Sequence, residues 1–131
     1  MRRLSIDTNI YVAFKNNDVN VAEVFRTCEV IGVDIAVIAE LFAGFSLGSK
    51  EAKNRRELEA FLNTPRVAVL PHDVETAEYY ALIVKKLKAK GKPIPSNDIW
   101  IAANSQKHGM ALYSFDRHFE EIEGLLVVGR K

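Results

Sequence analysis

Four acidic residues are the side chains in this sequence whose types and positions could do chemistry. Each stands at the edge of a mainly apolar segment: Asp7 after residues 4–6, Glu40 after 35–39, Asp98 before 99–103 and Asp116 after 111–115. A carboxylate beside a buried element is costly unless it is paired, hydrogen-bonded or bound to a metal. Hard divalent cations prefer oxygen ligands, so the four positions together favour one acidic metal-binding pocket assembled by the fold.

Each acid, taken alone, also has an ordinary structural interpretation. Asp7 and Asp98 could cap or begin a helix, where a carboxylate accepts backbone N–H groups and complements the helix dipole. Asp116 could form a surface ion pair with Arg117, worth at most about 1 kcal/mol. Glu40 is harder to explain in this way, because its neighbours between 37 and 43 are apolar. One metal site accounts for all four acids more economically than four separate structural roles.

Such a pocket would suit the chemistry of phosphodiesters. Carboxylates that lie close together repel one another, and Mg²⁺ or Mn²⁺ would neutralise them. The cation would also orient a phosphodiester, activate a water molecule and stabilise the leaving oxygen. Thr8 and Ser114 stand near these acids, and their hydroxyl groups suit hydrogen bonds to a carboxylate or to a metal-bound water. Satisfying local backbone groups is an equally good interpretation of both hydroxyls.

The elements that must position these residues are predicted from the apolar pattern. We expect strands at 2–6, 33–38, 66–70, 111–115 and 125–128, and helices at 8–15, 20–31, 39–47, 50–63, 73–90 and 97–108. This alternation predicts an α/β fold of three layers, α/β/α, with a mainly parallel central sheet. Sites in such sheets gather at the carboxyl ends of strands, where Asp7 and Asp116 are expected.

Length and composition predict one ordinary globular domain spanning residues 1–131. The chain is 48% hydrophobic and 27% charged, which argues against disorder. Its formal net charge of +1 gives no global attraction to nucleic acid, although an acidic site ringed by Lys and Arg would average to the same value.

The sequence also predicts a cytoplasmic protein with no membrane partner. No apolar run approaches the ~20 residues of a membrane span, and the first residues lack a secretory apolar region. Cys28 is the only cysteine, which excludes an intrachain disulfide. It falls in a helical apolar pattern and is expected to be a small buried hydrophobe.

In their order along the chain, the motifs resemble the PIN domain and, more narrowly, the VapC-type toxins of bacterial and archaeal toxin–antitoxin pairs. The matching motifs cover essentially the whole chain: Asp7-Thr8-Asn9, Glu40-Leu41-Phe42-Ala43-Gly44, Asp98-Ile99-Trp100-Ile101-Ala102-Ala103 and Ser114-Phe115-Asp116-Arg117-His118-Phe119. One departure is Ile38-Ala39 before Glu40, where many relatives carry a hydroxyl residue.

The resemblance implies a Mg²⁺- or Mn²⁺-dependent endoribonuclease that acts on structured RNA such as tRNA or a ribosomal RNA loop. It implies that the four acids bind the metal and that Thr8 and Ser114 supply supporting hydroxyls. It also implies a homodimer held inactive by a small VapB-like antitoxin, whose C-terminal segment lies in the active-site groove.

Several residues near these motifs are candidates for contact with the substrate. Asn9, Arg117 and His118 adjoin the acids, and Lys92 ends a lysine-rich segment, 85–92, six residues before Asp98. Lysines at a helix end also suit the helix dipole and solubility, which is the simpler interpretation.

One further segment, 41–47, is a candidate interface. It is unusually apolar for a helix beside an active site. Core packing accounts for part of it, and the rest could meet a second copy or the antitoxin.

Other functions remain open on the sequence. A structure-specific DNA nuclease of the same fold differs in substrate preference. A non-catalytic module, in which the acids bind a metal or receive a basic peptide, would show no cleavage at all. A metal-dependent phosphatase would hydrolyse small phosphomonoesters and leave RNA intact.

Overall fold

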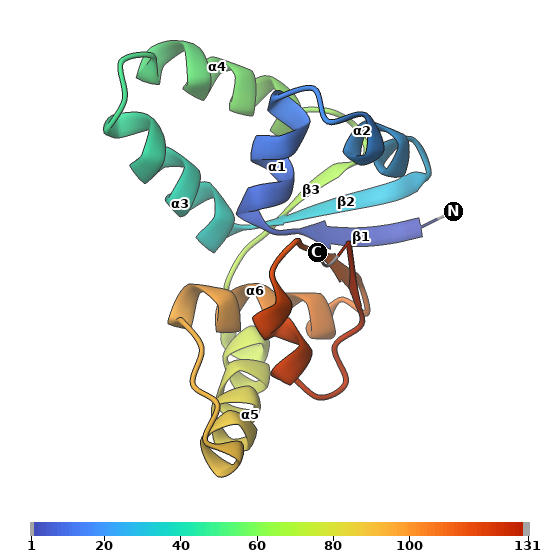
Figure 1. Ribbon diagram of the computed structural model, residues 1–131, viewed down its shortest axis with the longest axis vertical. Coiled ribbons are helices and arrows are strands. Elements are labelled where there is room, and N and C mark those ends of the chain that lie inside the picture. The colour runs from blue at the N-terminus through green and yellow to red at the C-terminus, as the bar shows by residue number, and fades with distance from the viewer. Residues whose placement is uncertain (1, 130–131) are drawn as a thin grey trace.

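Five parallel strands form the central sheet of this computed structural model, which describes residues 2–129 (Figure 1). The strands are β1 (Arg2–Ile6), β2 (Cys28–Asp34), β3 (Val67–Leu70), β4 (Ala111–Tyr113) and β5 (Val127–Val128). They lie in the order β3-β2-β1-β4-β5, and every neighbouring pair is parallel. The chain therefore builds one side of the sheet from β1 to β3 and then crosses β1 to place β4 on the other side.

Helices cover both faces of this sheet, which confirms the predicted α/β/α fold. Within residues 2–129 the α-helices are α1 (Thr8–Lys15), α2 (Val19–Arg26), α3 (Ile35–Ser46), α4 (Glu51–Leu62), α5 (Val74–Lys90) and α6 (Ser96–Lys107). Helices α1 to α4 lie on one face, and α5, α6 and the 3₁₀-helix η1 (Arg117–Glu121) lie on the other (Figure 1). None of these described helices has the length and apolar character needed to cross a membrane.

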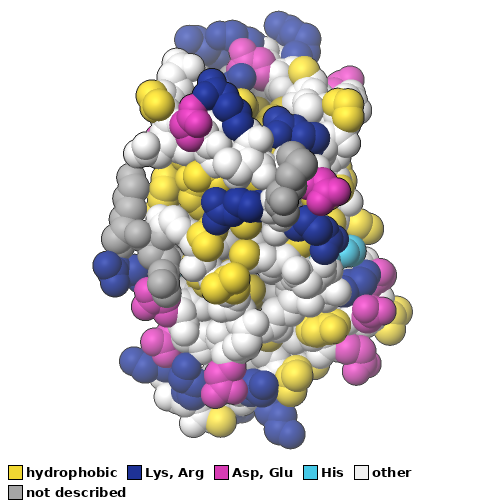
Figure 2. Space-filling view, turned by 90° about the vertical axis from the view of Figure 1, so that its right-hand side faces the viewer, with side chains coloured by type: hydrophobic (Ala, Val, Ile, Leu, Met, Phe, Trp, Pro, Cys, Tyr) yellow, Lys and Arg dark blue, Asp and Glu magenta, His cyan; other side chains and the backbone are white. Residues whose placement is uncertain are grey.

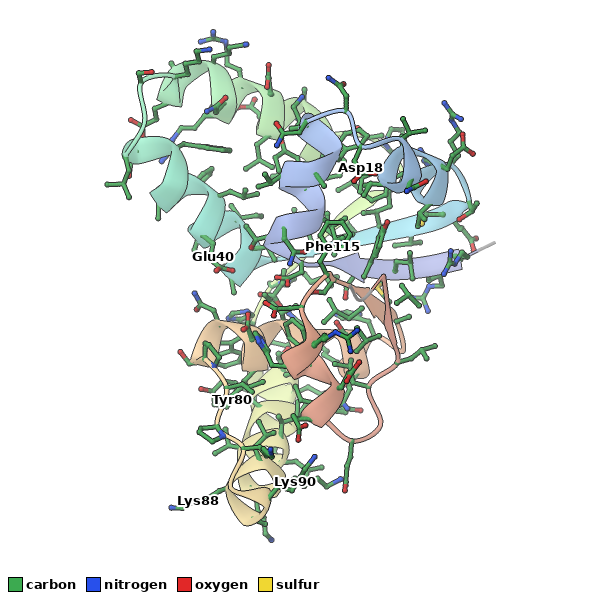
Figure 3. All side chains as sticks on the ribbon, viewed as in Figure 1. Asp18, Glu40, Tyr80, Lys88, Lys90 and Phe115 are labelled. Atoms are coloured by element: carbon green, nitrogen blue, oxygen red, sulfur yellow. The ribbon has the colours of Figure 1, made fainter. Side chains whose placement is uncertain are left out.

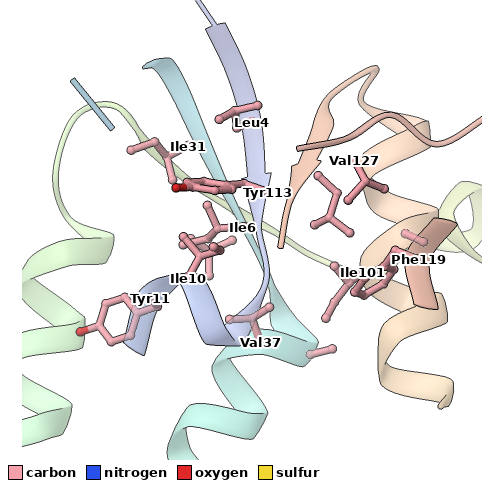
Figure 4. Packing of buried hydrophobic residues seen from close by; sticks show 14 of the residues in the cluster. Leu4, Ile6, Ile10, Tyr11, Ile31, Val37, Ile101, Tyr113, Phe119 and Val127 are labelled. Carbon is pink, nitrogen blue, oxygen red and sulfur yellow. The ribbon is translucent and has the colours of Figure 1, made fainter. Parts of the chain in front are cut away.

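The core forms because alternate residues of the strands face opposite layers. Leu4 and Ile6 of β1 are almost fully buried, and Ile6 lies beside Ile10 of α1 (Figure 4). Ile101 of α6 and Phe119 of η1 are fully buried on the other side of the sheet. Each such side chain contributes about 1.5–3 kcal/mol through removal from water.

The predicted elements are wrong between residues 28 and 38. The expected helix to residue 31 ends at Arg26, and the expected strand 33–38 is instead β2 followed at once by α3. Gly32 lies inside β2, where a Cβ atom would come within 2.8 Å of the Leu70 side chain. Cys28 is buried as expected, but in a strand. The strand 2–6 and the helix 8–15 are observed at the predicted bounds, and the other predicted elements are observed with shifted ends.

The reason for this error is the cap at the end of β2. Asp34 Oδ1 accepts a hydrogen bond from the backbone N–H of Ala36 at 2.7 Å, which starts α3 directly after the strand. The apolar, β-branched run that follows resembles a strand in sequence. It is helical because Ala36, Val37 and Leu41 share one buried face.

A buried carboxylate joins the helical layers at the carboxyl edge of β2. Asp34 is 1% exposed, and besides capping α3 it accepts a hydrogen bond from Asn104 Nδ2 of α6 at 2.6 Å. His72 lies just after β3, and its Nε2 is 2.7 Å from Asp34 Oδ1, the oxygen that also caps α3. One side chain thus ties together β2, α3, α6 and the segment after β3.

Asn104 extends this contact into α5 and β3. Its amide nitrogen lies 3.2 Å from the carbonyl oxygens of both Leu70 and Pro71, and its amide oxygen accepts from Thr76 Oγ1 at 3.0 Å. Asn104 and Thr76 are fully buried. Buried polar groups are stabilising when they are satisfied in this way and costly when one partner is removed.

We therefore expect Asn104→Leu to lower the free energy of unfolding by about 2–4 kcal/mol, because it removes a donor from a buried carboxylate. Urea unfolding followed by circular dichroism measures this loss. Gln106→Leu is the matched control on the same helix, since Gln106 donates only to the exposed carbonyl of Glu123. Equal losses in the two variants would contradict a special role for Asn104.

Candidate active site

The four predicted acids gather at the carboxyl edge of the sheet, where β1 and β4 lie side by side. Asp7 directly follows β1, and Asp116 follows β4 after two intervening residues. Glu40 extends from α3 toward α6 (Figure 3), and Asp98 stands in the first turn of α6. This edge is the topological switch point of the sheet, because the chain continues from β1 to one side and later returns to the other.

Asp7 is the most deeply buried of these acids, at 5% exposed. Its Oδ1 accepts from the backbone N–H of Thr8 at 2.8 Å, and its Oδ2 accepts from Ser114 Oγ at 2.7 Å. Burial raises the pKa of Asp7 to about 6, these two hydrogen bonds oppose the rise, and the charges of Asp98 and Glu40 add to it. The two hydrogen bonds thus fix the orientation of the Asp7 carboxylate, and burial makes its ionised form unfavourable.

The two predicted hydroxyls connect the acids to one another. Thr8 Oγ1 donates to Glu40 Oε1 at 2.9 Å, which links the first turn of α1 to α3. Ser114 Oγ donates to Asp7 and accepts from the backbone N–H of Asp116 at 3.0 Å. Both hydroxyls therefore bind site carboxylates, and Ser114 also satisfies a local backbone group.

His118 bridges the remaining two acids. Its Nε2 lies 2.6 Å from Asp98 Oδ2, and its Nδ1 lies 3.1 Å from Asp116 Oδ1. Both ring nitrogens can donate together only when the ring is an imidazolium. Burial raises the pKa of Asp98, His118 opposes the rise, and the charge of Asp116 adds to it.

The site offers carboxylate oxygens, which divalent cations prefer as ligands, but these oxygens do not form a complete coordination shell. Among residues 2–129, no three Asp, Glu, His or Cys side chains converge closely enough to hold a metal ion as they stand. The carboxylates point instead at Thr8, Ser114 and His118. They are nevertheless hard oxygen donors, and the pKa values of Asp7 and Asp98 are raised by burial and by the charges of neighbouring acids, a condition that a bound cation relieves.

The four predicted substrate contacts occupy different places around this cluster. Asn9 Oδ1 accepts from the backbone N–H of Phe115 at 3.4 Å, so it supports the chain after β4. Arg117 is exposed at the start of η1, and Lys92 is exposed in the loop before α6. His118 is in the cluster, but it contacts the acids themselves.

Sequence reasoning missed the residues that hold α3 and α6 beside Asp7. It gave no role to His72, Asp34 or Asn104, although the contacts described above link them to one another. One signal was available: Asp34 precedes an apolar helix as Asp7 does, and both serve as N-caps.

Figure 2 shows the opposite side of the molecule, on which the strands begin. Lys and Arg side chains are interspersed there with Asp, Glu and hydrophobic side chains (Figure 2). The four acids of the candidate site lie instead at the carboxyl edge of the sheet.

Comparison with known proteins places the chain in a family. The model of the PIN domain matches residues 4–125. Ribonuclease VapC1 of Haemophilus influenzae strain R2866 is 30% identical over an alignment of 127 residues, and the match covers 92% of this chain and 92% of that protein. This chain belongs to the PIN-domain family, among the VapC ribonucleases.

The likeness to other VapC proteins also extends over nearly the whole chain. Ribonuclease VapC4 of Mycobacterium tuberculosis is 28% identical over 128 residues, covering 98% of this chain and 97% of that protein. The crystal structure of DNA-bound VapBC from Salmonella typhimurium superposes with a TM-score of 0.86 at 25% identity, over 97% of both chains.

The raised pKa of Asp7 predicts how stability depends on pH in the absence of divalent cations. The folded protein binds this proton more tightly than the unfolded chain, whose Asp pKa is 3.8. The stability contributed by the protonated form is therefore fully present below pH 3.8 and is lost as pH rises through about 6. Since one pKa unit is about 1.4 kcal/mol, roughly 3 kcal/mol is lost by pH 7 and above.

Urea unfolding in EDTA at a series of pH values from about 3 to 8 measures this loss, a range that brackets both pKa values. Asp7→Asn is the matched variant, because it keeps the size of the side chain and cannot ionise. We expect its stability to fall less over the same range. Parallel pH profiles for wild type and Asp7→Asn would refute the assignment to Asp7.

Proposed function

We propose that this protein is a Mg²⁺- or Mn²⁺-dependent endoribonuclease and the toxin of a toxin–antitoxin pair. The observation that carries the proposal is the meeting of a buried, strained Asp7 with Glu40, Asp98 and Asp116 at the switch point of the sheet. Membership of the PIN family and the ribonuclease names of the VapC relatives support it. The RNA substrates we propose are structured, such as tRNA or a ribosomal RNA loop.

In this proposal each residue has a role that follows from its contacts. The four acids would hold the cation, which when bound supplies the positive charge that activates water and stabilises the leaving oxygen. Ser114 and the backbone N–H of Thr8 keep the Asp7 carboxylate in one orientation, and the Thr8 hydroxyl orients Glu40. His118 keeps two like charges, those of Asp98 and Asp116, side by side.

Hydrolysis by water breaks the P–O3′ bond without using the 2′-hydroxyl of RNA as the nucleophile. The products are then a 5′-phosphate and a 3′-hydroxyl. A 2′,3′-cyclic phosphate product would show a different mechanism.

We further propose a VapB-like antitoxin and a second copy of the chain as partners. The similar Salmonella structure is a VapBC complex, which supports the first of these. A basic side chain of the antitoxin, placed among the acids, would relieve their mutual repulsion as a metal ion does. Segment 41–47 is the candidate surface, with Leu41 buried against the core and Leu47 at 89% exposed.

Purified, antitoxin-free protein tests the activity on total RNA, tRNA and single-stranded DNA, with Mg²⁺, Mn²⁺ or EDTA. We expect metal-dependent RNA cleavage that Asp98→Asn lowers by about 100-fold or more, since loss of a group supporting a metal ligand already lowers activity about 10–100-fold. Glu29→Gln makes the same chemical change at an exposed site in β2 and should leave cleavage unchanged. Cleavage of DNA alone would favour a DNA nuclease, and metal binding without cleavage would favour a binding module.

The Ser114 hydroxyl gives a separate test of the metal site. We expect Ser114→Ala to weaken Mn²⁺ binding about 10–100-fold, because Asp7 loses the donor that orients it. Isothermal titration calorimetry measures this affinity without any RNA. Ser49→Ala, at an exposed position between α3 and α4, is the control. Unchanged Mn²⁺ affinity in Ser114→Ala would argue against Asp7 as a ligand.

A further inference from the structure

A groove lies between α5 and the loop that leads into α6. It has a volume of about 400 Å³, within the range of small-molecule sites. Val84, Leu87, Ile94 and Ile99 supply its apolar walls, and Lys88 and Lys92 also line it. Ile99 directly follows Asp98 in α6, whereas Lys88 lies at the end of α5 far from Glu40 (Figure 3), so the groove runs from the first turn of α6 toward the carboxyl end of α5.

The two lysines of the groove differ from their neighbours on α5. Lys86 lies 3.6 Å from Glu123, and Lys90 lies 3.3 Å from Glu121 and donates to its backbone carbonyl at 2.7 Å. Lys88 extends on the side of α5 away from η1, whereas Lys90 points toward η1 (Figure 3). Within residues 2–129, neither Lys88 nor Lys92 forms an ion pair, so their charges are available to a ligand.

We propose that this groove binds a nucleotide of a single-stranded RNA segment whose strand continues along the groove to the acidic cluster. The base lies between the aliphatic walls, and the adjoining phosphates lie against Lys88 and Lys92. This inference rests on the proposed ribonuclease function. It also gives the lysine-rich end of α5 a defined ligand.

Charge favours this occupant over the two alternatives. A second copy docked through the same groove on a two-fold axis would bring Lys88 and Lys92 close to their own copies, which repel. An acidic peptide has the right charge for the lysines but no reason to continue into a cluster of carboxylates. An RNA strand needs both features, because one of its phosphates must enter the cluster together with the cation.

The first test uses nucleotides alone, so it does not depend on cleavage. Methyl NMR spectra of Val84, Leu87, Ile94 and Ile99 are recorded while each of the four nucleoside 5′-monophosphates, and ribose 5-phosphate, is added in EDTA. We expect at least one nucleotide to shift these methyl signals more than ribose 5-phosphate does. No shift with any of the four nucleotides would overturn the inference.

A pair of double variants separates the groove lysines from charge in general. Lys88→Ala/Lys92→Ala should weaken nucleotide binding about 10-fold, as expected for the loss of two charge-assisted contacts. Lys50→Ala/Lys85→Ala removes the same charge from exposed positions outside the groove and should have no effect. Equal weakening in both double variants would overturn the inference.

The second test measures RNA cleavage and distinguishes the inference from the proposed function. Lys88→Ala/Lys92→Ala should raise KM about 10-fold with little change in kcat. It should also lower the slope of log affinity against log salt by about 1.4, since each phosphate contact on a single strand contributes about 0.7. If wild type cleaves RNA and the variant cleaves it with the same KM and salt slope, the inference fails and the ribonuclease stands. If wild type cleaves no RNA, the proposed function fails, whatever the nucleotides do in the NMR experiment.

Ile94→Trp fills the groove and gives an independent check. It should raise KM as the lysine variant does and leave the sedimentation coefficient unchanged. A change from dimer to monomer would show that the groove is an interface between copies. Shifts of the same methyl signals by a poly-glutamate peptide, and by no nucleotide, would show an acidic peptide site; either result overturns the inference.

Discussion

The candidate active site depends on a carboxylate that is not part of it. Asp34 is buried at the end of β2, caps α3 and accepts a hydrogen bond from Asn104 of α6. Helix α3 carries Glu40, and α6 carries Asp98. The two helices come from opposite faces of the sheet, and the backbone ladder of the strands does not fix the distance between them. A satisfied buried carboxylate links the two helices directly, because moving either helix would remove one of its donors.

Asp7 and Asp34 occupy corresponding positions at the ends of neighbouring strands, and both cap a helix. Their roles nevertheless differ. Asp34 meets donors from three directions, from Ala36, His72 and Asn104, and so it holds elements together. Asp7 has only the two donors described above. Burial and, to a lesser extent, the charges of Asp98 and Glu40 raise its pKa, so the folded protein is less stable when Asp7 is ionised. The hydrogen-bonded Asp34 stabilises the fold, whereas the buried charge of Asp7 destabilises it. Such a difference is expected where a functional site is built into a fold.

Much of the fold could be predicted from sequence because it rests on local periodicity, whereas part of the site rests on contacts between distant segments. The period of apolar residues identified the helices and most strands, and the placement of acids at their edges identified the cluster. The segment around Asp34 was misread because the apolar run of α3 resembles a buried strand, and only the cap at Asp34 separates the two. The pairing of Asn104 with Asp34 could not be predicted, since it requires knowing which helix faces which strand end. The bridge that His118 makes between two acids has the same origin.

The net charge near zero conceals an uneven distribution of charge, which matters for the binding of a polyanion such as RNA. The carboxyl edge of the sheet concentrates negative charge, which repels RNA, whereas the opposite side mixes both signs (Figure 2). Two features can overcome that repulsion without removing the acids: a divalent cation held among them and positive charge along the path of the strand that leads to them. In the proposed complex, Lys88 and Lys92 supply the second feature from the groove between α5 and the loop before α6. Lys86 and Lys90 are instead ion-paired with Glu123, just after η1, and with Glu121 at the end of η1. On α5, Lys86 and Lys90 therefore contribute to the fold through their ion pairs, whereas Lys88 remains for the proposed contact with the substrate.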